Sequence, residues 1–252
     1  MDLHVAGRVY LVTGGSRGLG HATAAQLVAE GARVVVAARD EAGARQAADR
    51  LGGPGSALGL GADLADPTAA QRLVEAAREA FGRLDGALVS VGGPPSGTAA
   101  QATDEQWRAA FESVFLGAVR LARTVAESVP EEGGAIGLVL SSSARSPIAG
   151  LGISNGLRPG LAMVAKDMAD EFGPRGVRIF GLLPGRIATD RVRELDAAAG
   201  PGAAERHAAS IPLRRYGEPA EFGRVAAFLL SPAAGYVTGS LVAVDGGLLR
   251  AL

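Results

Sequence analysis

A glycine-rich loop, Thr13-Gly14-Gly15-Ser16-Arg17-Gly18-Leu19-Gly20, is the clearest candidate for chemistry in this sequence. Residues 8–13 before it are apolar and β-branched, as in a buried parallel strand, and apolar residues recur at helical spacing over 21–30. On such a strand-to-helix turn, glycines let a diphosphate approach the backbone, and the first N–H groups of the helix attract its charge. The loop therefore predicts a dinucleotide site rather than an ordinary tight turn.

The residues at the end of the second predicted strand indicate which dinucleotide the loop would bind. An acidic residue about twenty residues after the loop would bind the ribose 2′-hydroxyl of NAD(H), whereas an arginine accommodates the 2′-phosphate of NADP(H). This chain has Ala38 and then Arg39, and Arg17 in the loop can approach the same region. Because two guanidiniums suit a phosphate dianion, the sequence favours NADP(H) over NAD(H). The alternative is that Arg39 pairs with Asp40 or Glu41.

The elements that must position the loop alternate along the whole chain. We expect strands at residues 8–13, 33–38, 56–61, 86–91, 135–140, 177–183 and 241–244. Helices are expected at 21–30, 41–51, 66–81 and 104–129, with another that ends near 172. This alternation predicts an α/β fold, a doubly wound, Rossmann-like parallel seven-stranded sheet with helices on both faces. Ligands of such sheets bind at the carboxyl ends of the strands, where the loop lies.

Composition and charge narrow the classes of function. The chain has 252 residues, is 48% hydrophobic and has no linker-like stretch, so we expect a single domain over 1–252. A net charge of −1 gives no electrostatic case for nucleic acid or an anionic membrane. No secretory signal pattern or membrane-length apolar run is evident, and a cytoplasmic protein is expected. With no cysteine and three scattered histidines, no metal site is predicted.

These features resemble the short-chain dehydrogenase/reductase family. Residues 13–20 match its TGxxxGxG loop, and Pro184-Gly185-Arg186-Ile187-Ala188-Thr189 matches its PGxxxT segment beside the nicotinamide. Ala62-Asp63-Leu64 resembles its adenine-contacting segment, and parts of 211–247 resemble its C-terminal segments. Gly92-Gly93-Pro94-Pro95 is similar to a branch labelled 3-oxoacyl-carrier-protein reductase-like.

The resemblance implies where a cofactor and a substrate would bind. The implied cofactor residues lie in the loop, after the next strands and in the PGxxxT segment: Gly14, Ser16, Arg17, Gly18, Leu19, Gly20, Arg39, Asp63, Leu64, Gly92, Arg158, Pro184, Gly185, Ile187 and Thr189. It also implies a small-molecule substrate under a lid at about 188–215. Relatives assemble through the helix that here carries Trp107, so a homo-oligomer, tetramer or dimer, is expected.

The catalytic positions depart from the family pattern. The family uses a serine after the fifth strand, a tyrosine and a lysine in YxxxK, and an asparagine in the preceding long helix. Ser141 fits the serine, with Ser142 and Ser143 as possible substitutes, but thirteen residues after Ser141 the chain has Ser154 in place of tyrosine. Arg158 replaces the lysine and Val114 the asparagine. Ser141, Ser154 and Arg158 are therefore the candidate catalytic residues.

The replacements change the expected proton chemistry. A serine hydroxyl is a much weaker acid than a phenol, and a guanidinium orients groups or stabilises an oxyanion but is a poor proton donor. A positioned general acid is worth roughly 10²–10⁴-fold, so ordinary ketone reduction would be weakened but not excluded. Water, or a substrate whose product needs little help with protonation, would then fill the role.

The local sequence also indicates a disturbed helix start. Asn155-Gly156 and Pro159-Gly160 favour turns, and Pro159 lacks the N–H that a helix interior needs. A helix that begins late, near Leu157 or Arg158, would accommodate Pro159 and move Arg158 relative to the cofactor. Sequence drift after loss of catalysis is the alternative explanation.

Three functions remain open on the sequence. The favoured one is an NADP(H)-dependent oxidoreductase that transfers a hydride between the nicotinamide and a carbonyl or alcohol substrate. The second is a repurposed fold for non-redox chemistry of the dehydratase, epimerase or cyclase type. The third is a non-catalytic NADP(H)-binding subunit. His207 and Arg186 in the lid region are weaker candidates for an acid or an anion ligand, since such residues more often form a solvated helical face.

Overall fold

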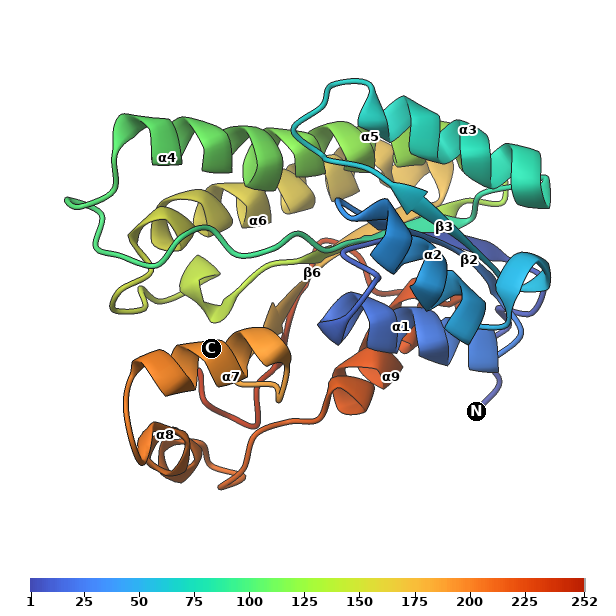
Figure 1. Ribbon diagram of the computed structural model, residues 1–252. Coiled ribbons are helices and arrows are strands. Elements are labelled where there is room, and N and C mark those ends of the chain that lie inside the picture. Colours follow the sequence, from blue (N-terminus) through green and yellow to red (C-terminus); the bar gives the residue numbers. More distant parts are fainter. Residues whose placement is uncertain (252) are drawn as a thin grey trace.

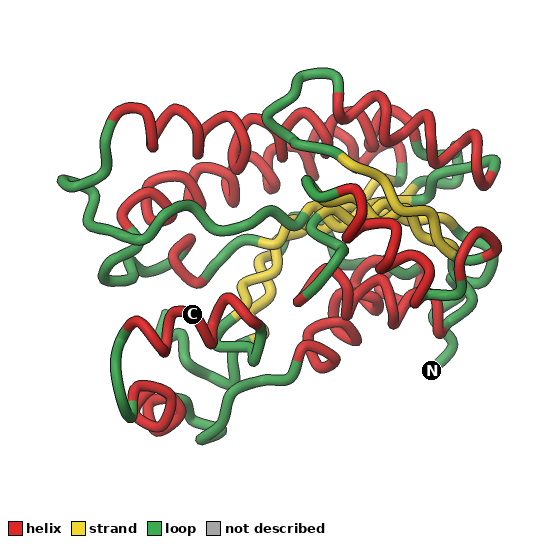
Figure 2. Tube along the Cα trace, in the orientation of Figure 1, coloured by secondary structure: helices red, strands yellow, loops and turns green. Residues whose placement is uncertain are grey.

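One parallel sheet organises the molecule (Figures 1 and 2). Its strands lie in the order β3-β2-β1-β4-β5-β6-β7. The computed structural model describes residues 1–251. The seven strands are β1 Val9–Thr13, β2 Arg33–Ala38, β3 Ala57–Gly61, β4 Gly86–Val89, β5 Gly134–Val139, β6 Val177–Pro184 and β7 Leu241–Val244. The strand order reverses between β1 and β4, which places the end of β1 at the crevice where such sheets bind ligands. The predicted doubly wound fold is confirmed.

Helices cover both faces of the sheet (Figure 1). In chain order they are α1 Gly18–Ala29, α2 Glu41–Arg50, α3 Ala69–Phe81, α4 Asp104–Ala110, α5 Gly117–Ser128, α6 Gly152–Phe172, α7 Asp190–Ala198, α8 Ala203–Ser210 and α9 Pro219–Leu230. One apolar core lies between the sheet and α3, α5 and α6, and a second lies between the sheet and α1, α2 and α9. Successive strand residues therefore point into different cores, as Val34 and Val35 do.

Two expected helices differ from the structure. The helix expected over 104–129 is interrupted, because Phe111–Leu116 forms a π-helical segment between α4 and α5. The helix near Pro159 does not begin late, since α6 starts at Gly152 and contains Pro159. Asn155 fixes this early start: its side chain accepts a hydrogen bond from the Ile148 N–H (3.0 Å) and donates one to the Ile148 carbonyl (2.9 Å).

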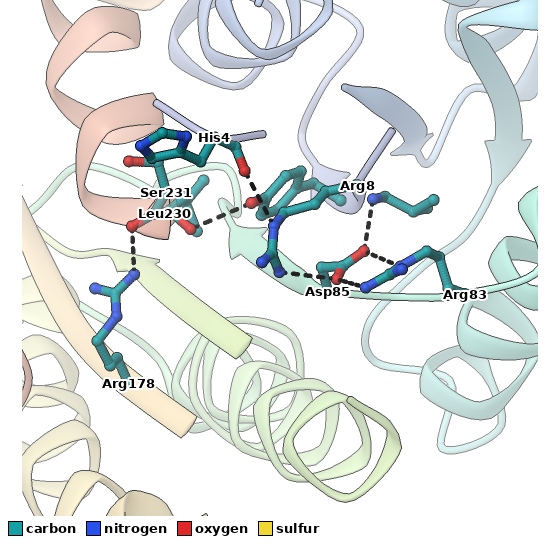
Figure 3. Close-up of polar contacts among 9 residues, drawn as sticks. His4, Arg8, Arg83, Asp85, Arg178, Leu230 and Ser231 are labelled. Carbon is teal, nitrogen blue, oxygen red and sulfur yellow. Dashed lines mark hydrogen bonds and ion pairs between the residues drawn. The ribbon is translucent and has the colours of Figure 1, made fainter. Parts of the chain in front are cut away.

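A buried carboxylate joins the amino-terminal ends of the two central strands (Figure 3). Asp85, which directly precedes β4, is 2% exposed and accepts a hydrogen bond from the Val9 N–H of β1 at 2.9 Å. Arg8 and Arg83 pair with the same carboxylate at 3.1 and 2.6 Å. The carboxylate thus has a charged partner and a backbone donor, the condition for burying it without a large penalty. It lies at the end of the sheet opposite to the glycine loop.

The Asp85 contacts lead to a stability prediction. Asp85→Asn removes the charge that two guanidiniums need, so the free energy of unfolding should fall by about 2–3 kcal/mol in urea titrations. Asp49→Asn, at an exposed position of α2, is the matched control and should change the free energy of unfolding by less than about 0.5 kcal/mol. Equal stability of Asp85→Asn and Asp49→Asn would contradict a stabilising role for this cluster.

Candidate functional site

The glycine loop connects β1 to α1 and has no room for side chains at three of its glycines, Gly14, Gly15 and Gly20. Gly14 has a φ of 58°, and a Cβ there would lie 2.7 Å from the Ser90 carbonyl oxygen. A Cβ at Gly20 would lie 2.5 Å from the carbonyl oxygen of Gly14. Arg17, which precedes α1, has extended backbone and no side-chain hydrogen bond that caps the helix. The first turn of α1 therefore keeps its backbone donors available for an anion.

The loop meets other predicted cofactor segments at the carboxyl edge of the sheet. The Thr13 hydroxyl donates to the Ser90 carbonyl (2.8 Å) and accepts from the Ser90 N–H (2.9 Å), which ties the end of β1 to the end of β4. A Cβ at Gly18 would lie 3.6 Å from Cγ2 of Thr189, so the loop faces the segment that follows β6. The structure thus brings together two motifs that are far apart in the sequence.

Two arginines beside the loop remain available to a ligand. Among residues 1–251, neither Arg17 nor Arg39 forms an ion pair, and both are exposed. The carboxylates that might have paired with Arg39 have other partners: Asp40 accepts from the Ala42 N–H at 3.2 Å, and Glu41 pairs with Arg45. The Gly15 N–H donates to the Ala37 carbonyl at 3.2 Å, so the loop touches the end of β2 just before Arg39.

The remaining predicted cofactor residues lie at the same edge or on the connections from it. Asp63 follows β3 and is exposed, whereas Leu64 is buried under α5. Ser16 is partly buried in the loop, and Gly92 is exposed after β4. Gly185, after β6, has no space for a Cβ, which would lie 2.5 Å from Cβ of Asp245. Ile187 is 3% exposed, and Thr189 caps α7.

Three serines after β5 and on α6 form a compact hydroxyl group. Ser143 and Ser154 are 3% and 6% exposed, and their Oγ atoms are 3.0 Å apart. The Ser141 Oγ accepts a hydrogen bond from the Ser143 N–H at 3.1 Å. Ser141 therefore orients the turn, while Ser143, which the sequence offered only as a substitute, is the hydroxyl that contacts Ser154.

Arg158 is a buried cation without a carboxylate partner. Its side chain is 4% exposed, Nη1 donates to the Val139 carbonyl of β5 at 2.7 Å, and Nε has no hydrogen-bond partner. Burial lowers the pKa of Arg158 to about 10, which leaves it cationic at neutral pH. An unpaired buried charge is costly for folding, so its retention points to a ligand that would complete its contacts.

The position of the family's helix asparagine is apolar here. Val114 is 3% exposed in the π-helical segment and packs with Ile153 and Leu157 of α6. Trp107 packs against the same cluster, over Gly156. The side chains of this cluster are apolar, so it offers no acid or base for proton transfer. Val114 nevertheless lies in a π-helical segment, and such segments often lie at functional sites.

A groove of about 390 Å³ is formed by residues near the serines in sequence, although none of the three serines lines it. Pro147, Ile148 and Asn155 line one side of it, and Thr98 and Ala99 line the other. The two sides are joined by a backbone bridge between Gly97 and Leu151. The groove is largely apolar, and part of its lining follows the serine turn in sequence, so it is a candidate space for part of a substrate.

The segment expected as a lid carries α7 and α8, which lie apart from the helices that cover the sheet (Figure 1). Its two ends meet, because Ile187 and Gly217 form an isolated parallel bridge. Arg186 and His207, which the sequence offered as weaker candidates, are in contact, with 3.0 Å between Nη2 of Arg186 and Nε2 of His207. Sequence reasoning missed Asp196 and Tyr216, which complete this contact group and have no motif to mark them.

Comparisons with known proteins place the chain among oxidoreductases. Residues 14–249 match a protein family described as enoyl-(acyl carrier protein) reductase. The chain is 34% identical to L-rhamnose 1-dehydrogenase (NAD(P)(+)) of Azotobacter vinelandii over 96% of each chain. It is 31% identical to 3-oxoacyl-acyl-carrier-protein reductase of Escherichia coli, over 98% of this chain and 99% of that protein.

A solved structure is similar over the full length. L-sorbose reductase from Gluconobacter frateurii, determined in complex with NADPH and L-sorbose, has a TM-score of 0.90 at 31% identity, and the match covers 100% of both chains.

Within residues 1–251, no helix has the length and apolar character needed to cross a membrane.

Arg158 gives a test of whether its burial serves folding or function. Arg158→Met removes an unpaired buried charge, so the cofactor-free protein should be equally stable or up to about 2 kcal/mol more stable in thermal unfolding. Arg158→Lys, which keeps the charge, should show no such gain. A loss of more than about 2 kcal/mol in Arg158→Met would instead identify the guanidinium as a structural clamp on Val139.

Proposed function

Because this chain belongs to the short-chain dehydrogenase/reductase family, we propose that it is an NADP(H)-dependent oxidoreductase acting on a carbonyl or alcohol substrate. The observation that carries the proposal is the unpaired, buried guanidinium of Arg158, at the position where the family places its lysine. Drift in a protein without catalysis would readily lose such a group, since its burial costs stability.

The cofactor assignment is supported by the shape and charge of the loop. Gly14 and Gly20 leave the backbone accessible to a diphosphate, and the uncapped start of α1 supplies donors and a partial positive charge. Arg17 and Arg39 would hold the 2′-phosphate, since neither has a carboxylate partner among residues 1–251. The complex of L-sorbose reductase with NADPH supports the same choice. When bound, NADPH supplies a hydride.

The chain's own residues would then manage the substrate oxygen. In the Ser143–Ser154 pair, one hydroxyl donates to the other, which leaves the acceptor's proton free to donate to a substrate oxygen. Arg158 would hold hydroxyls of the cofactor ribose or stabilise negative charge on that oxygen. Nη1 is bound to the Val139 carbonyl, whereas the buried Nε has no partner and, with the other free guanidinium N–H groups, would donate to the ligand. The final proton would come from water through the serine pair.

The same proposal includes a lid and an assembly. The segment 188–215 would cover the substrate, because α7 and α8 lie beside the PGxxxT segment and the bridge between Ile187 and Gly217 joins the two ends of the segment.

A homo-oligomer is supported by large apolar side chains that are exposed on neighbouring helical segments, Phe111 at 42% and Met163 at 70%. Phe111 stacks on Phe115 with the ring centroids 5.3 Å apart, which extends this apolar surface.

Arg39 tests the choice of cofactor. Arg39→Ala removes a guanidinium–phosphate contact, so the Kd for NADPH should rise at least about tenfold, while the Kd for NADH should not change. Titrations followed by nicotinamide fluorescence measure both values. Arg50→Ala, an exposed arginine at the end of α2, is the control and should bind both cofactors as the wild type does. Equal weakening of NADPH and NADH by Arg39→Ala would contradict a 2′-phosphate contact.

The serine pair tests the reaction itself. With NADPH and a panel of aldehydes and ketones, Ser154→Ala and Ser143→Ala should each lower kcat about 10²-fold, the lower end for loss of a positioned proton donor. Ser142→Ala is the matched control, since the Ser142 side chain is outside the pair, and should retain kcat. If the wild type oxidises no NADPH with any compound of the panel, the oxidoreductase proposal is wrong.

A further inference from the structure

Four polar side chains fasten the segment between Ile187 and Gly217 to the end of β6. We call them the Asp196 cluster: Arg186, Asp196, His207 and Tyr216. One oxygen of Asp196 lies 2.6 Å from Nη1 of Arg186 and 3.0 Å from Nδ1 of His207. Its other oxygen accepts from the Tyr216 hydroxyl at 2.9 Å. The cluster joins α7, α8 and the segments before and after them.

Apolar packing within α7 and α8 contributes little to holding these helices in place. α7 has no buried residue, and Ala203 is the one buried residue of α8. The Asp196 carboxylate, by contrast, is only 11% exposed, although it lies on a helix that is otherwise open to solvent. The guanidinium of Arg186 also lies over the ring of Tyr216, 5.9 Å from its centroid. Polar contacts therefore determine where α7 and α8 sit relative to the sheet.

The hydrogen bonds of the cluster require one protonation state. Arginine can only donate, so Nε2 of His207, 3.0 Å from Nη2 of Arg186, must accept. The imidazole is then neutral, and its Nδ1–H donates to Asp196. Burial and the bond to Asp196 raise the pKa of Tyr216, which keeps its phenol a donor. Every contact is satisfied in this state and in no other.

We infer that Asp196 and His207 are positioning residues that hold α7 and α8 beside the cofactor-flanking segment Pro184–Thr189. They act through Arg186, which lies within that segment and whose carbonyl accepts a hydrogen bond from the Gly217 N–H at 3.0 Å. This inference rests on the proposed function for the lid's role over a substrate. It requires no direct contact between the cluster and the reacting atoms.

Hydrogen exchange of the full chain, followed by mass spectrometry, tests the cluster without substrate or cofactor. At pH 7.5, amides of residues 190–210 in Asp196→Asn and in His207→Phe should exchange about tenfold faster than in the wild type. Controls on the same helices, Glu194→Gln and Glu205→Gln, should behave as the wild type.

Kinetics then connect the cluster to the reaction. Asp196→Asn should raise the KM for the carbonyl substrate about tenfold and change kcat little, because a displaced lid weakens substrate binding but leaves the serine pair intact. Wild-type protection of residues 190–210 in Asp196→Asn, or in His207→Phe, overturns the inference. These exchange results do not depend on turnover, so they separate a failure of the cluster from a failure of the oxidoreductase proposal.

Discussion

Burying a guanidinium without a carboxylate is expensive, and the site of this protein is arranged around that constraint. Arg158 donates from Nη1 to the Val139 carbonyl, and its buried Nε has no hydrogen-bond partner. The unfavourable free energy of burying this charge is offset by the extensive surrounding core and by the Asn155 side chain, which anchors the first turn of α6. A methionine would be easier to bury there, so the charge and the fork geometry of arginine are the properties to explain.

The parallel sheet determines what surrounds this charge. All strands end at one edge, so the glycine loop after β1, Ser90 after β4, the serine turn after β5 and the PGxxxT segment after β6 converge there although they are far apart in sequence. The opposite edge carries the fully paired Asp85 carboxylate, which joins β1 to β4. Satisfied polar contacts thus stabilise one end of the sheet, and groups with unused donors gather at the other.

Sequence patterns were sufficient where a local rule determines the structure. The bounds of β2 and β7 follow from their apolar runs, and the glycine loop follows from its strand and helix context. The π-helical segment was not predictable, because a change of backbone hydrogen-bond register leaves no period in the sequence. The predicted late start of α6 was wrong. The prediction considered only the effect of Pro159 on the helix backbone, whereas the side chain of Asn155 holds the first turn against Ile148. Asp196 escaped notice because its partners lie on three other segments, and no spacing rule relates them.

The most direct test of the account follows the hydride. The wild-type chain is incubated with NADPH deuterated at the transferred position of the nicotinamide C4 and with carbonyl compounds, and the products are examined by mass spectrometry and NMR. The account predicts one deuterium on the former carbonyl carbon for each NADPH oxidised. Product that forms without deuterium and without NADPH consumption would contradict it, and would indicate non-redox chemistry at the same site.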